Sequence, residues 1–68
     1  MTDAERRLLH ALANMCDQYL TDRRDGLLDH QSMMAGEEAV ECLSQYGLVE
    51  PAPRGGRWTA AGRAILES

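Results

Sequence analysis

The stretch of residues 47–66, GLVEPAPRGGRWTAAGRAIL, limits the fold more than any other part of this 68-residue chain. It holds both prolines, two adjacent glycines and the only tryptophan. Proline has no N–H to donate to a sheet, so a strand over residues 48–50 is expected to stop at the first proline. Residues 57–59 are the natural partner strand, and Thr59 can cap a helix over residues 60–67. The stretch therefore predicts a hairpin followed by a C-terminal helix.

The sequence allows two alternatives for the loop of this hairpin. A tight turn at the two glycines would set Arg54 opposite Arg57, which opposes like charges and leaves prolines within a strand. A longer loop over residues 51–56 instead lets Glu50 face Arg57 and brings Val49 near the tryptophan. We favour the longer loop, with the tryptophan as a core plug under the hairpin.

Residues 3–20 have the apolar spacing of an amphipathic helix, with Thr2 or Asp3 as its N-cap. Two neighbouring apolar stripes run along it. The first consists of Leu8, Leu12, Met15 and Tyr19, and the second of Leu9, Ala13, Cys16 and Leu20.

A polar loop over residues 21–26 follows, and residues 27–28 then return toward the core. Asp29 or Ser32 can cap a second helix that ends at Gly47, and a start at Gly36 is the alternative. The apolar set of this helix is Met33, Ala35, Ala39, Val40, Cys42, Leu43 and Tyr46.

The size and charge of the chain exclude several functions. A single domain of 68 residues has little room for a substrate cleft, so we expect no enzyme and no cofactor. A net charge of −4 argues against generic nucleic-acid binding. All seven cations are arginine, which is typical of a GC-rich bacterial or phage genome. The acidic N-terminus lacks a signal-peptide pattern, so we expect a cytoplasmic protein.

The cysteines and histidines do not form a recognisable metal or catalytic motif. Cys16, Cys42, His10 and His30 lack the close spacing of zinc ligands, so we expect no metal site. A Cys–His nucleophile would also need an orienting group, and none lies at a suggestive position. Both cysteines fall on apolar helix faces, and we expect them to be reduced, buried thiols.

The order helix, loop, helix, YGLVE, basic loop and RWTAAGRAIL resembles the second half of winged-helix domains in MarR-like and PadR-like bacterial regulators. Residues 47–50 match the strand before the wing of those families, and residues 58–63 match the segment that leads into the next helix. The resemblance covers residues 35–66 and implies a small α+β, winged-helix-like domain over residues 1–68. That domain has three helices and a two-stranded hairpin as its wing.

Two departures from this family affect the expected function. The space between Leu20 and Gly47 is too short for both helices of a helix-turn-helix, so the first is reduced to a turn around residues 27–29 or missing. The helix that would enter DNA carries acidic residues and no cation, which is poor chemistry beside phosphate. Those residues are Glu37, Glu38 and Glu41.

We therefore expect a non-enzymatic bacterial or phage accessory protein that binds an unidentified protein partner. Its docking surface would consist of Met33, Met34, Glu37, Glu38 and Glu41. The adjacent methionines fit either a partner surface or the imperfect amphipathicity of a small helix.

The alternative function is a DNA-binding regulator that uses a basic wing. Its contacts would be Arg54, Arg57 and Arg63. The simpler interpretation is a solvated loop tip whose arginines pair with Glu50 or Glu67.

Overall fold

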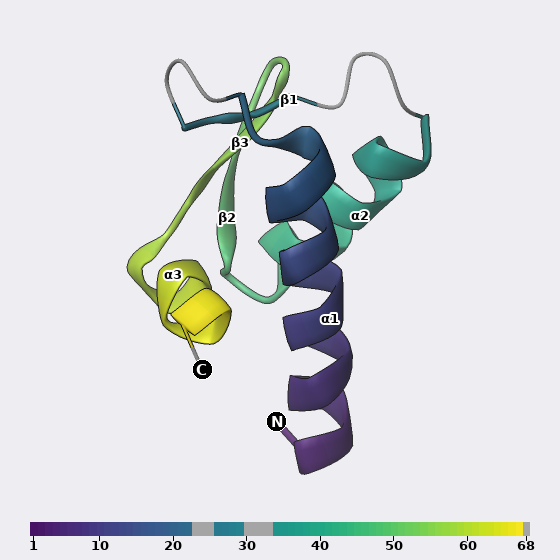
Figure 1. Cartoon of the computed structure of the whole chain (residues 1–68), viewed down its shortest axis with the longest axis vertical. Coiled ribbons are helices and arrows are strands. Elements are labelled where there is room, and N and C mark those ends of the chain that lie inside the picture. Colours follow the sequence, from purple (N-terminus) through teal and green to yellow (C-terminus); the bar gives the residue numbers. More distant parts are fainter. Residues whose placement is uncertain (23–25, 30–33, 68) are drawn as a thin grey trace.

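The computed structural model describes residues 1–22, 26–29 and 34–67 (Figure 1). Three helices surround a small antiparallel sheet whose strand order is β1-β3-β2. Along the chain the elements are α1 (Asp3–Leu20), β1 (Leu28–Asp29), α2 (Met34–Gln45), β2 (Val49–Ala52), β3 (Gly55–Trp58) and α3 (Ala60–Glu67). The predicted architecture, a small α+β winged-helix-like domain with a hairpin, is confirmed, and the sheet has one strand more than expected.

Helix α1 has the predicted bounds and begins at a capping box. The Glu5 backbone N–H donates to the Thr2 hydroxyl at 3.1 Å, and the Thr2 backbone N–H donates back to the Glu5 carboxylate at 3.2 Å. These bonds satisfy two backbone donors that the helix leaves unpaired at its start. The hydrogen bonds from the backbone and side chain of Thr2 also lower the pKa of the Glu5 carboxyl.

The core buries the second of the two apolar stripes of α1 and only part of the first. Leu9, Ala13, Cys16 and Leu20 are buried, whereas Leu8, Met15 and Tyr19 are exposed. From the first stripe, Leu12 is half-buried and packs against the core, because the domain covers one side of this helix. The remaining core residues are Leu28, Ala39, Val40, Leu43, Leu48, Val49 and Trp58.

The hairpin has the predicted register and a shorter loop than predicted. Val49 pairs with Trp58 and Glu50 with Arg57, as expected, but the ladder continues to Ala52 opposite Gly55. The expected long loop over residues 51–56 is therefore wrong. Pro51 is tolerated inside β2 because β2 is an edge strand, where a residue without an N–H can turn that side outward.

The two glycines that suggested a turn instead form the start of β3, the central strand. β1 pairs with them, with Leu28 opposite Gly56 and Asp29 opposite Gly55. A Cβ at Gly55 would overlap the Leu28 carbonyl oxygen, and one at Gly56 would overlap the Val49 side chain. Close approach of neighbouring strands, rather than turn geometry, is the reason for this glycine pair.

Helix α2 starts at Met34 and stops at Gln45, one turn before β2. Gly47 ends the helical region with a φ of 74°, the left-handed conformation that glycine adopts without strain. The alternative start at Gly36 is wrong by two residues, and Ser32, an expected cap, lies outside the described residues. Asp29, the other expected cap, belongs to β1.

Helix α3 is joined to the sheet by the segment TAAG. The Thr59 backbone N–H donates to the Leu48 carbonyl at 3.1 Å, and its hydroxyl donates to the Gly47 carbonyl at 2.7 Å. The same hydroxyl accepts from the Gly62 backbone N–H at 3.0 Å, which makes Thr59 the predicted cap.

Gly62, in the first turn of α3, packs directly against Leu48, the residue before β2 to which Thr59 is hydrogen-bonded. A Cβ at this position would overlap the Leu48 carbonyl oxygen and lie 2.9 Å from a ring carbon of Trp58. Trp58 is buried, which confirms its expected role as a core plug. None of the helices in the described ranges is long and apolar enough to cross a lipid bilayer.

Replacing Gly62 by alanine should therefore destabilise the domain. An alanine in a helix normally improves stability by about 1 kcal/mol over glycine, but here the methyl group must displace a backbone carbonyl. Overpacking of this kind costs about 2 kcal/mol. Urea unfolding followed by Trp58 fluorescence measures the free energy of unfolding. Ala64→Gly, an exposed site on α3, is the control and should cost about 1 kcal/mol; a Gly62→Ala protein more stable than the wild type would contradict this packing.

Candidate interaction surfaces

The three glutamates singled out by the sequence lie on the exposed side of α2. Glu37, Glu38 and Glu41 are all exposed. Glu37 and Glu41 are four residues apart and therefore share one helix face. Together they form one wall of a groove, which we call the acidic groove; Glu38 is not part of its lining.

The acidic groove runs between α2 and the hairpin and has a volume of about 240 Å³. Pro51 and Ala52, from β2, give it an apolar side across from α2, and Val40 adds apolar surface on α2 itself. The Ser44 hydroxyl also lines it and donates to the Glu41 backbone carbonyl at 2.8 Å. The groove thus combines two negative charges with a short apolar strip. That combination suits a positively charged side chain with an aliphatic stem.

The methionine part of the expected docking surface is not defined by the structure. Met33 lies outside the described residues, and Met34 is the first residue of α2. The placement of the two methionines beside the acidic groove therefore remains a prediction from the sequence.

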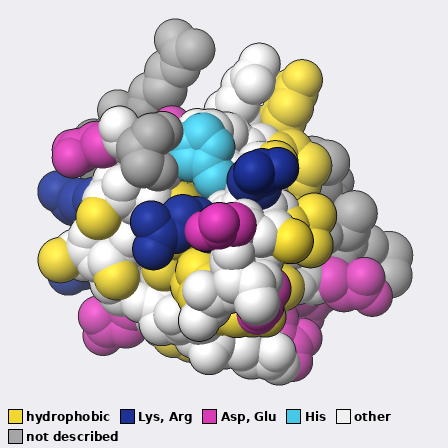
Figure 2. Space-filling model, turned by 90° about the horizontal axis from the view of Figure 1, so that it is seen from below, with side chains coloured by type: hydrophobic (Ala, Val, Ile, Leu, Met, Phe, Trp, Pro, Cys, Tyr) yellow, Lys and Arg dark blue, Asp and Glu magenta, His cyan; other side chains and the backbone are white. Residues whose placement is uncertain are grey.

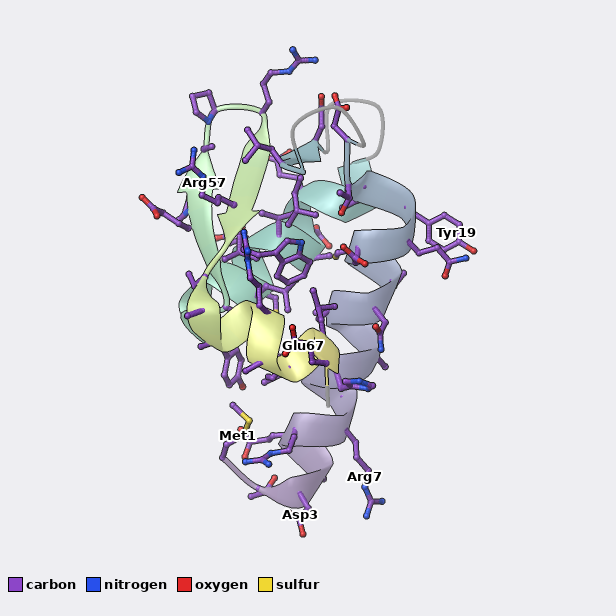
Figure 3. The ribbon with its side chains drawn as sticks, turned by 60° about the vertical axis from the view of Figure 1, so that its left-hand side comes forward. Met1, Asp3, Arg7, Tyr19, Arg57 and Glu67 are labelled. Atoms are coloured by element: carbon purple, nitrogen blue, oxygen red, sulfur yellow. The ribbon has the colours of Figure 1, made fainter. Side chains whose placement is uncertain are left out.

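The arginines of the hairpin each face a carboxylate-bearing residue. Arg54, at the tip, forms an ion pair with Asp29 of β1 at 2.9 Å. Arg57 lies opposite Glu50 in the ladder and extends from the outer face of the hairpin (Figure 3). The expected pairing of these arginines with Glu50 or Glu67 missed Asp29, because β1 itself was not predicted. The Arg54–Asp29 pair connects the tip of the hairpin to β1.

Arg63 is exposed on α3. The face seen from below in Figure 2 shows basic and acidic side chains interspersed among apolar ones, with no continuous basic patch on that face.

Cys16 and Cys42 are free thiols on the facing helices α1 and α2. Burial raises the pKa of the Cys16 thiol, and the charge that Cys42 would carry raises it further. Cys16 is fully buried and Cys42 half-buried, so both act as small apolar groups in the packing.

The described part of the chain contains no cluster of metal-binding side chains. No group of three or more histidine, cysteine or acidic side chains there could hold an ion, and His30 lies outside that part.

A second groove, of about 350 Å³, lies between the start of α1 and α3 and is lined mainly by apolar residues. Arg6 is the one charged residue in its described lining.

Comparisons of this chain with protein-family models, with curated proteins and with solved structures gave no match. The fold and the chemistry of its surfaces are therefore the basis of the functional argument.

The two thiols should react with alkylating reagents at different rates. Only the thiolate reacts, and the raised pKa and full burial of Cys16 both reduce its reactive fraction. Mass spectrometry after iodoacetamide treatment at pH 8 should show Cys42 modified at least tenfold faster than Cys16. In urea, where burial is lost, the two rates should converge; equal rates in the folded protein would contradict the packing of α1 on α2.

Proposed function

We propose that this chain is a non-enzymatic protein–protein interaction module that binds a basic segment of a partner in the acidic groove. The observation that carries this proposal is the position of Glu37 and Glu41 on one wall of a groove with an apolar opposite side. A lysine or arginine of the partner would place its charge between the carboxylates and its methylene groups against Pro51 and Ala52. The overall charge of −4 supports attraction of such a partner.

The same groove gives no support to catalysis. It is open to solvent and is lined by carboxylates, a serine and apolar residues. Among its described lining residues, the Ser44 hydroxyl donates to a backbone carbonyl rather than to a base, which covalent catalysis would need. We assign the chain to bacterial or phage accessory proteins of the winged-helix kind on the resemblance of residues 35–66. We place it in the cytoplasm because its two cysteines are unpaired.

A titration with a basic peptide tests this proposal. An acetylated, amidated hexapeptide that alternates arginine and alanine should shift the backbone NMR signals of Glu37, Glu41 and Ala52 most strongly. Glu37→Lys combined with Glu41→Lys should weaken the binding at least tenfold, because it replaces attraction by repulsion at both carboxylates. Glu67→Lys, an exposed site on α3, is the control and should bind within twofold of the wild type.

A partner captured from the host should show the same dependence. It should be recovered by the wild type and by Glu67→Lys and lost by the double reversal on α2. Circular dichroism establishes that the double variant is folded. Unchanged peptide binding by this folded variant would overturn the assignment of the acidic groove.

A DNA-binding regulator is the second candidate function, and it rests on the exposure of Arg54 and Arg57 on one hairpin. The tip arginine is 69% exposed even though it pairs with Asp29. To bind a phosphate backbone, Arg54 would have to exchange the Asp29 carboxylate for a phosphate. Glu37 and Glu41 on α2 would add repulsion if that helix approached the same duplex.

Fluorescence anisotropy with a labelled duplex at 20 mM salt separates the two functions. If the interaction module is the correct assignment, the protein should show no saturable binding up to about 50 µM. Saturable binding that weakens steeply with salt, and is lost in Arg54→Ala combined with Arg57→Ala, would instead establish the regulator. Gln45→Ala, an exposed site on α2, is the control in that case.

A further inference from the structure

Helix α1 carries an apolar stripe that the described part of the domain leaves largely exposed. Leu8 is 72% exposed, Met15 43% and Tyr19 67%, although each is a large apolar or aromatic side chain. Tyr19 points away from the hairpin and α3 (Figure 3). The exposed Ala4 and Ala11 complete the stripe, because positions 4, 8, 11 and 15 follow the spacing of four and three that keeps residues on one helix face. We call these five residues the outer stripe.

Small and large residues alternate along the first four positions of the outer stripe. Ala4 is followed by Leu8, then by Ala11 and Met15. In an antiparallel pair of these helices, Leu8 of one copy would lie opposite Ala11 of the other, and Met15 opposite Ala4. Leu8 and Met15 then each meet an alanine, so the knobs of one helix fill the holes of the other, and Tyr19 lies beyond the paired segment. In a parallel pair each residue would meet its own equivalent, which leaves alanine facing alanine.

Electrostatics favours the same arrangement. Between Ala4 and Tyr19 the outer stripe contains no charged residue, so pairing would bury no ion. Arg7 lies beside it and extends outward (Figure 3). An antiparallel pair separates the two copies of Arg7 along the axis, whereas a parallel pair would set them at the same level. Antiparallel helices also align opposite ends of their dipoles.

We propose that two copies of this chain associate through an antiparallel pairing of their α1 helices along the outer stripe. The interface has two-fold symmetry, which requires a self-complementary surface of this kind. An 18-residue helix is about 27 Å long, and a contact face about 10 Å wide covers roughly 300 Å² in projection. This is less than half of the roughly 800 Å² per partner in a standard interface. An interface this small belongs to the weak, transient class, so we expect the dimer to form reversibly, at concentrations on the order of 100 µM.

Sedimentation equilibrium between 10 µM and 1 mM tests the association. The wild type should change from a monomer of 7.5 kDa toward twice that mass as its concentration rises. Leu8→Glu should weaken association at least tenfold, because it places a charge at the centre of the interface. Gln45→Lys on α2, another exposed site where the charge changes, should behave as the wild type. Circular dichroism and Trp58 fluorescence report that each variant is folded.

A mixture of two variants tests the antiparallel orientation. Leu8→Glu and Ala11→Lys should each be monomeric alone, because each places its new charge against an apolar residue of the second copy. An equimolar mixture should dimerise, because the antiparallel pair brings the new carboxylate opposite the new ammonium group. In a parallel pair the two substituted positions would not meet.

Three results would overturn the proposal. A wild type that is monomeric at 1 mM would contradict the dimer. Dimerisation that Leu8→Glu leaves unchanged would contradict the outer stripe as its interface. Loss of association in both variants without recovery in their mixture would contradict the antiparallel orientation. Each outcome is independent of the acidic groove, because Glu37 and Glu41 lie on a different helix.

Discussion

The close approach of α3 to the start of β2 determines how the rest of the domain packs. Gly62 lies against the Leu48 carbonyl and the Trp58 ring at a distance that no side chain permits. Thr59 holds the same joint by donating from its backbone to Leu48 and from its hydroxyl to Gly47. With α3 fixed in this way, Trp58 is buried in the core between the sheet and the helices. Its indole Nε1 finds no hydrogen-bond partner among the described residues, so the ring stabilises the core by packing.

Sequence patterns predicted the elements whose determinants are local. The capping box at Thr2, the glycine after α2 and the threonine cap of α3 all act within a few residues, and the corresponding helix ends agree with the structure. The register of Val49 with Trp58 was also predictable, because cross-strand charge pairing selects it. Local signals failed where distant segments decide the outcome. β1 has only two residues, and its pairing with β3 is visible only once the glycines at positions 55 and 56 are seen as places of close approach.

The surfaces were harder to predict than the fold for the same reason. Periodicity identified two apolar stripes on α1, but how much of each stripe is buried depends on where α2 and α3 pack. The exposure of Leu8 and Tyr19 therefore could not be derived from their spacing. The carboxylates of α2 were recognised from sequence, whereas the apolar side of the acidic groove depends on the hairpin being longer than expected. The ion pair between Arg54 and Asp29 likewise depends on β1.

Native-state hydrogen exchange measured by NMR tests the central role of the joint between α3 and the sheet. The Thr59 amide, bonded to the Leu48 carbonyl at 3.1 Å, lies at this joint. If the rest of the packing depends on it, this amide should exchange only through global unfolding, with an exchange free energy equal to the free energy of unfolding in urea. Exchange of Thr59 through local opening, as fast as that of the first turn of α1, would contradict this account.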